Sequence, residues 1–119
     1  MGNEHGTDNY GQINVMEELR ERIRQETDRK KAQNLLWDEL VLRQNQTFRT
    51  VKGLEYTYQI RGNEMFVSRK TKSITKASVN LAFEQIIELK GAVAGPKKLK
   101  CFGASYLYPV FIEMGLIER

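Results

Sequence analysis

The feature that most constrains the fold is a change of hydrophobic period near the middle of the chain. In residues 54–60, large apolar side chains alternate with polar ones, the pattern of a half-buried strand. Gly62-Asn63 then supplies a two-residue hairpin turn with glycine first. The predicted cross-strand pairs are Arg61 with Glu64, Ile60 with Met65 and Tyr58 with Val67. This register places unlike charges opposite each other and apolar side chains on one face.

Apolar residues at helical spacing precede this hairpin in the sequence. Asn14 is a candidate N-cap for a helix that begins at Val15. Its apolar stripe is interrupted over residues 25–31, where Thr27 or Asp28 could cap a second helix, and it resumes as far as Leu42. The region therefore forms either one long helix or a pair of helices, and residues 43–46 end it.

Apolar residues at helical spacing also follow the hairpin. Apolar positions between residues 79 and 89 predict a helix that is capped by Ser73 or Thr75 and ends at Gly91. Pro96 suits a further helical turn, and Pro109 divides or kinks whatever helix the tail forms.

The order of these elements predicts an α+β fold. Its parts are an N-terminal helix or helix pair, a small antiparallel meander with the hairpin, and two or three C-terminal helices. Residues 47–51 are expected to form the first strand of the meander, joined to the hairpin through Lys52-Gly53. Residues 1–12, rich in glycine and asparagine, are expected to be a disordered leader, and residues 13–119 a single domain.

The residue counts argue against several chemistries. The chain has one histidine, His5 in the expected leader, and one cysteine, Cys101. A zinc site needs several such ligands, and a nucleophilic couple would have to recruit a histidine from a mobile tail. We therefore predict no catalytic residue, no metal, no cofactor and no small-molecule substrate. An enzyme that uses Glu or Lys chemistry is the third and weakest interpretation.

The same sequence predicts a cytoplasmic protein without a membrane partner. No apolar stretch approaches the ~20 residues that cross a bilayer. The polar N-terminus does not resemble a secretory signal, and a single cysteine allows no internal disulfide. Cys101 follows Lys100, which could lower its pKa, although a small buried apolar role is the favoured interpretation.

Positive charge is concentrated in the second half of the chain. Residues 1–64 hold 10 Lys/Arg and 11 Asp/Glu, whereas residues 65–119 hold 9 and 4. The cations cluster in two runs without an intervening acid, the first being Arg69, Lys70, Lys72 and Lys76 and the second Lys97, Lys98 and Lys100. A localised positive face indicates a phosphate-rich partner. The Ser73 and Thr75 hydroxyls, at the start of the predicted helix, could add hydrogen bonds to a phosphate.

Whether the two runs share a face is left open by the sequence. A helix of ~16 residues between them would separate their loops by ~24 Å. Such a span could cover several phosphates or place the runs on unrelated surfaces.

The tail offers a further hypothesis. Residues 111–119 resemble the end of a winged-helix recognition helix, which implies that Ser105, Tyr106 and Tyr108 face a DNA groove. The sequence departs from that pattern because Pro109 lies inside the helix, no second wing strand follows, and the hairpin precedes the helices. An ordinary C-terminal helix with Phe111 and Met114 in the core is therefore favoured.

The sequence thus predicts a non-enzymatic nucleic-acid-binding protein, with DNA favoured over RNA. The predicted contact residues are Arg69, Lys70, Lys72, Ser73, Thr75, Lys76, Lys97, Lys98, Lys100, Ser105, Tyr106 and Tyr108. The alternative is a protein–protein interaction or assembly module that uses the amphipathic region 15–42. Either function is compatible with a homodimer.

Overall fold

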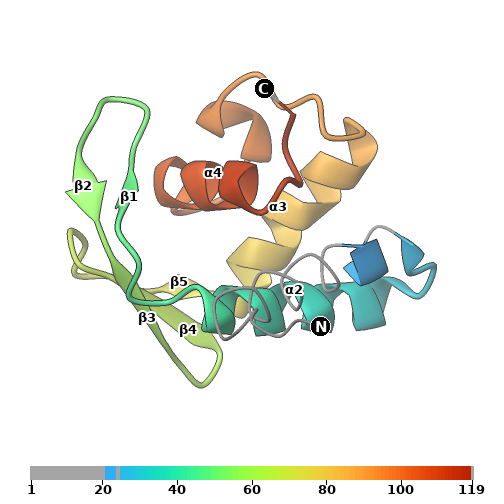
Figure 1. Cartoon of the computed structure of the whole chain (residues 1–119), viewed down its shortest axis with the longest axis horizontal. Coiled ribbons are helices and arrows are strands. Elements are labelled where there is room, and N and C mark those ends of the chain that lie inside the picture. Colours follow the sequence, from blue (N-terminus) through green and yellow to red (C-terminus); the bar gives the residue numbers. More distant parts are fainter. Residues whose placement is uncertain (1–20, 24, 119) are drawn as a thin grey trace, which may run out of the picture. The chain divides into compact units, whose positions relative to one another are not determined.

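The computed structural model describes residues 21–23 and 25–118 (Figure 1). These residues fall into two units, one that ends at Glu39 and one that begins at Leu40. The predicted leader, residues 1–12, and the predicted cap Asn14 lie outside the described residues. The prediction of a single domain over residues 13–119 stays a prediction.

The first unit answers the question of one N-terminal helix or two. Residues 21–23 and 25 are helical, the chain leaves the helical conformation at 26–28, and α2 (Arg29–Leu42) follows. Asp28 caps α2, since its Oδ1 accepts hydrogen bonds from the backbone N–H groups of Lys30 at 3.0 Å and Lys31 at 3.2 Å. The helices are therefore separate, and Asp28 rather than Thr27 is the cap.

The strands of the second unit form two antiparallel sheets. β1 (Phe48–Arg49) pairs with β2 (Glu55–Tyr56), while β3 (Tyr58–Arg61), β4 (Glu64–Val67) and β5 (Ile74–Thr75) form a three-stranded sheet. The β3–β4 register is the predicted one in all three pairs. Gly62 has a φ of +60°, as the glycine-first turn requires.

Two details of the strands differ from the prediction. The strand expected over residues 54–60 is interrupted at Thr57, so β2 and β3 belong to different sheets. At this point the Thr57 N–H donates to the Ser68 hydroxyl oxygen at 3.0 Å instead of to a carbonyl of a neighbouring strand. The short strand β5 has no alternation that sequence reasoning could detect.

The helices of the second unit confirm the α+β fold. α3 (Lys76–Glu88) is capped by Thr75, whose Oγ1 accepts from the Ser78 N–H at 3.2 Å. Its apolar stripe is buried at Val79, Ala82, Phe83 and Ile86. The 3-10 helix η2 (Pro96–Leu99) and α4 (Ala104–Glu113) then follow as separate elements, with Pro109 inside α4.

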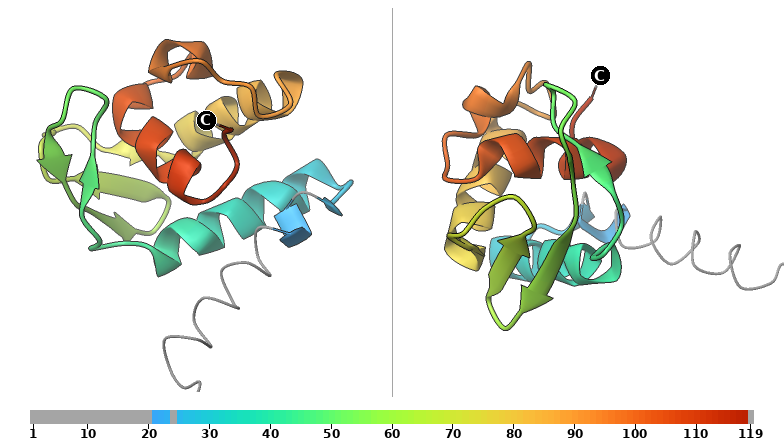
Figure 2. Two further views of the ribbon diagram at one scale, coloured as in Figure 1. Left: turned by 45° about the horizontal axis from the view of Figure 1, so that its top comes forward. Right: turned by 90° about the vertical axis from the view of Figure 1, so that its left-hand side faces the viewer.

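The chain turns back after α3, and this return positions the later segments. η2 contacts both α3 and α4, and β1 contacts α4 (Figure 2). The Tyr56 hydroxyl donates to the Tyr106 carbonyl oxygen at 2.6 Å, which ties β2 to α4. Phe111 and Met114 are fully buried, so the tail packs in the core as favoured. Among the described helices, none is long and apolar enough to cross a membrane.

Candidate functional site

A hollow in the second unit gathers residues from three parts of the chain. They come from the β1–β2 connection, from the loop after β4, and from the segment that runs from η2 to the first turn of α4. The hollow has a volume of about 710 Å³, within the range of small-ligand sites. We call this concavity the basic hollow. The residues that line it are Thr50, Val51, Lys52, Leu54, Lys70, Pro96, Lys97, Lys100, Cys101, Phe102, Gly103, Ala104, Ser105 and Tyr106.

The two predicted basic runs meet at this hollow. Lys70 belongs to the first run, and Lys97 and Lys100 belong to the second. The sequence left open whether the length of α3 keeps them apart. The 13 residues of α3 span ~20 Å, but the returning chain brings Gly103, three residues after Lys100, back to Ile74 directly before that helix.

The contact that closes this return is between Gly103 and Ile74. A Cβ atom built on Gly103 would lie 2.4 Å from the Ile74 Cδ1 atom, and the glycine has a φ of +80°. Ile74 is fully buried in β5, directly before α3. Only glycine combines this approach with this backbone conformation, so Gly103 holds the beginning of α4 against Ile74, directly before α3.

An exposed aromatic ring lies in the hollow beside the lysines. Phe102 is 39% exposed. The Lys70 Nζ atom lies 4.8 Å from the Phe102 ring centre and 5.7 Å from that of Tyr106, and the Lys72 Nζ atom lies 5.0 Å from Phe102. Cation–π contacts at exposed sites contribute about 0.5–1 kcal/mol each. They hold Lys70 and Lys72 loosely over an apolar surface.

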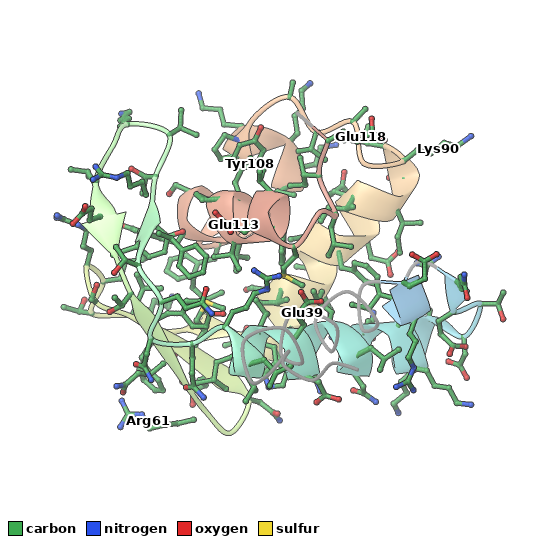
Figure 3. The ribbon with its side chains drawn as sticks, in the orientation of Figure 1. Glu39, Arg61, Lys90, Tyr108, Glu113 and Glu118 are labelled. Carbon is green, nitrogen blue, oxygen red and sulfur yellow. The ribbon has the colours of Figure 1, made fainter. Side chains whose placement is uncertain are left out.

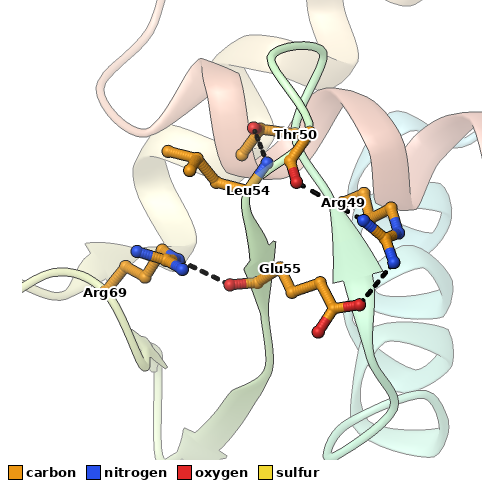
Figure 4. Close-up of polar contacts among 6 residues, drawn as sticks. Arg49, Thr50, Leu54, Glu55 and Arg69 are labelled. Carbon is orange, nitrogen blue, oxygen red and sulfur yellow. Dashed lines mark hydrogen bonds and ion pairs between the residues drawn. The ribbon is translucent and has the colours of Figure 1, made fainter.

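The hollow is positively charged, and no acidic side chain of its described lining neutralises the lysines. Among the lining residues that the structure describes, there is no aspartate or glutamate. Glu55 on β2 is paired instead with Arg49 at 2.5 Å, an exposed ion pair that adds little stability. The backbone carbonyl of Glu55 accepts from the Arg69 Nε at 2.5 Å, which anchors the start of the first run (Figure 4).

Some of the predicted contact residues are engaged elsewhere in the protein. The Ser73 hydroxyl donates to the Glu64 carboxylate at 2.5 Å, and the Thr75 hydroxyl caps α3. The Lys76 N–H donates to the Asn63 carbonyl at the hairpin turn. These groups surround the start of α3 with internal contacts and with one acid, Glu64. A phosphate there would meet hydroxyls that are already hydrogen-bonded.

Four other predicted residues are also absent from the lining of the basic hollow: Arg69, Lys72, Lys98 and Tyr108. Lys98 is exposed on η2 but is not among the lining residues. The hydroxyl of Tyr108, which is labelled in Figure 3, donates to the Val93 carbonyl at 3.2 Å. Tyr108 lines a second hollow, of about 580 Å³. Tyr106 and Tyr108, which the winged-helix resemblance places in one groove, thus line different hollows.

The structure adds residues that sequence reasoning missed. Phe102 lies two residues after Lys100, the end of the second run, and an aromatic residue beside clustered cations is a signal for nucleic-acid binding. Lys52 lies in the β1–β2 turn, where a lone lysine carries no signal. Val51 and Leu54 line the hollow and are 67% and 47% exposed, an exposure that no sequence pattern predicts.

Burial changes the acidity of two groups near the hollow. The thiol of Cys101, half-buried in the wall, has its pKa raised to about 11 by desolvation. The direction is opposite to the lowered pKa that the neighbouring Lys100 could cause, and it argues against a reactive thiolate. Burial, and to a lesser extent the proximity of Tyr106, raises the pKa of Tyr56 well above its usual range, so the phenol keeps the proton it donates.

Known proteins give no further guidance to this site. Comparison with protein-family models, with curated proteins and with solved structures gave no match. Within residues 21–23 and 25–118, no group of three or more His, Cys, Asp or Glu side chains could hold a metal ion. The candidate site therefore rests on the basic hollow alone.

Proposed function

We propose that this protein binds nucleic acid, without catalysing a reaction, through the basic hollow. The observation that carries the proposal is that lysines from both basic runs line one concavity together with an exposed aromatic ring. Ammonium groups are ligands for phosphates, and aromatic rings are surfaces for bases. A polynucleotide presents both groups along one chain.

The chemistry of the lining favours binding over catalysis. Among its described residues there is no histidine, aspartate or glutamate that could act as a general acid or base. Its one cysteine has a raised pKa, opposite to the activation that a nucleophile needs. What the lining offers a ligand is charge, apolar surface and the exposed Ser105.

The proposal predicts salt-dependent binding of nucleic acid. About four phosphate contacts, one for each lining lysine, should reduce the affinity about a hundredfold between 50 and 200 mM salt, because bound counterions are released. Fluorescence anisotropy with labelled DNA and RNA oligonucleotides measures this slope and also compares the two nucleic acids. Absence of binding to both at about 50 mM salt would contradict the proposal.

A further inference from the structure

We infer that the basic hollow takes an unpaired nucleotide segment rather than a duplex backbone; this inference rests on the proposed function. Three apolar side chains lie in the hollow and are substantially exposed: Val51, Leu54 and Phe102. A phosphate gains nothing from such surface, whereas the face of a base can be buried against it. In a duplex those faces are stacked on one another and are out of reach.

The arrangement of the lysines agrees with this ligand. Lys70 and Lys72 are held over the Phe102 ring by cation–π contacts. Such contacts are weaker at exposed sites than the stacking of a base on an aromatic ring. A base can therefore displace an ammonium group from the ring, and the displaced ammonium group remains close enough to pair with the adjoining phosphate. Lys97 and Lys100 supply charge for the neighbouring phosphates on the other run.

The shape of the hollow points the same way. Its volume of about 710 Å³ suits a few extended nucleotide groups but not the width of a double helix, which could touch only the rim. Because every base has an apolar face, the hollow should bind unpaired strands with little sequence preference.

The test compares single-stranded and duplex DNA on the full chain. Labelled dT12 and a 12-base-pair duplex are titrated at about 50 mM salt, and we expect dT12 to bind about tenfold more tightly. Phe102→Leu should weaken dT12 binding about tenfold, the loss of one stacked base, and should change duplex binding less than about twofold. The salt slope should persist, since the lysines remain.

Phe66→Leu is the matched control, because Phe66 also carries a cation, Arg61 at 4.2 Å, but lies on β4 outside the hollow. It should leave both affinities unchanged. Duplex binding as tight as that of dT12, or a Phe102→Leu variant that loses nothing or loses both ligands equally, would overturn this inference and leave the proposed function standing. No binding of either DNA ligand would overturn this inference, and it would overturn the proposed function as well if RNA oligonucleotides also fail to bind.

Discussion

Replacing Lys70, Lys97 and Lys100 together by glutamine should weaken nucleic-acid binding about a hundredfold at 50 mM salt. These three residues line the hollow and represent both basic runs. An ammonium–phosphate contact at about 4 Å in water contributes about 1 kcal/mol, so three lost contacts give about that factor. The slope of log affinity against log salt should also become shallower by about 2 for a single strand. Anisotropy titrations at several salt concentrations measure both effects.

The control variant removes the same charge outside the hollow. Lys76, Lys90 and Lys98 are absent from the lining residues, and two of them belong to the same basic runs. Their combined change to glutamine lowers the net charge equally and should weaken binding less than about fivefold, by long-range attraction alone. Equal losses in the two triple variants would show that general charge, and not the hollow, binds the ligand.

Gly103→Ala should destabilise the second unit by about 3 kcal/mol. The left-handed backbone, with a φ of +80°, costs a residue with a Cβ atom about 1–2 kcal/mol. The added methyl group would lie 2.4 Å from Cδ1 and 2.6 Å from Cγ1 of the fully buried Ile74, and such overpacking costs about 1–3 kcal/mol. Thermal denaturation should show a midpoint lower by at least about 10 °C.

Gly53→Ala separates the cost of the left-handed backbone from the cost of the clash with Ile74. Gly53 has a φ of +90°, and a Cβ atom there would have nothing within 4 Å, so this substitution should cost only about 1 kcal/mol. Both changes stiffen the unfolded chain alike, so that contribution cancels in the comparison. If the two variants were equally stable, Gly103 would not hold the beginning of α4 against β5, and the explanation of how the two basic runs meet would be wrong.

The local structure of the hairpin could be predicted from the sequence because it depends on neighbouring residues. The alternation around Tyr58 and the turn at Gly62 fix the register without information from the rest of the chain. The same is true of the Thr75 cap and the stripe of α3. The interruption at Thr57 could not be predicted, since it coincides with a hydrogen bond to Ser68, 11 residues away.

The site was only partly predictable because it depends on long-range packing. The charge count identified Lys70, Lys97 and Lys100, but their proximity depends on the contact between Gly103 and Ile74, 29 residues apart in the sequence. Ser73 looks like a phosphate ligand in sequence, whereas in the structure the register brings Glu64 to its hydroxyl. From the sequence alone, an apolar residue such as Leu54 is expected in the core, and only the fold shows that it is exposed.

The claim that the basic hollow is the binding site is tested most directly at Cys101. It is the chain's only cysteine and lies in the hollow's wall, so its alkylation rate reports on occupancy. With a pKa of about 11, the rate in the free protein should rise about tenfold per pH unit up to that pH. At pH 9 and low salt, saturating dT12 should slow alkylation at least about tenfold, because phosphates disfavour the thiolate and the strand covers it. An unchanged rate under saturation would place the ligand elsewhere and contradict the account.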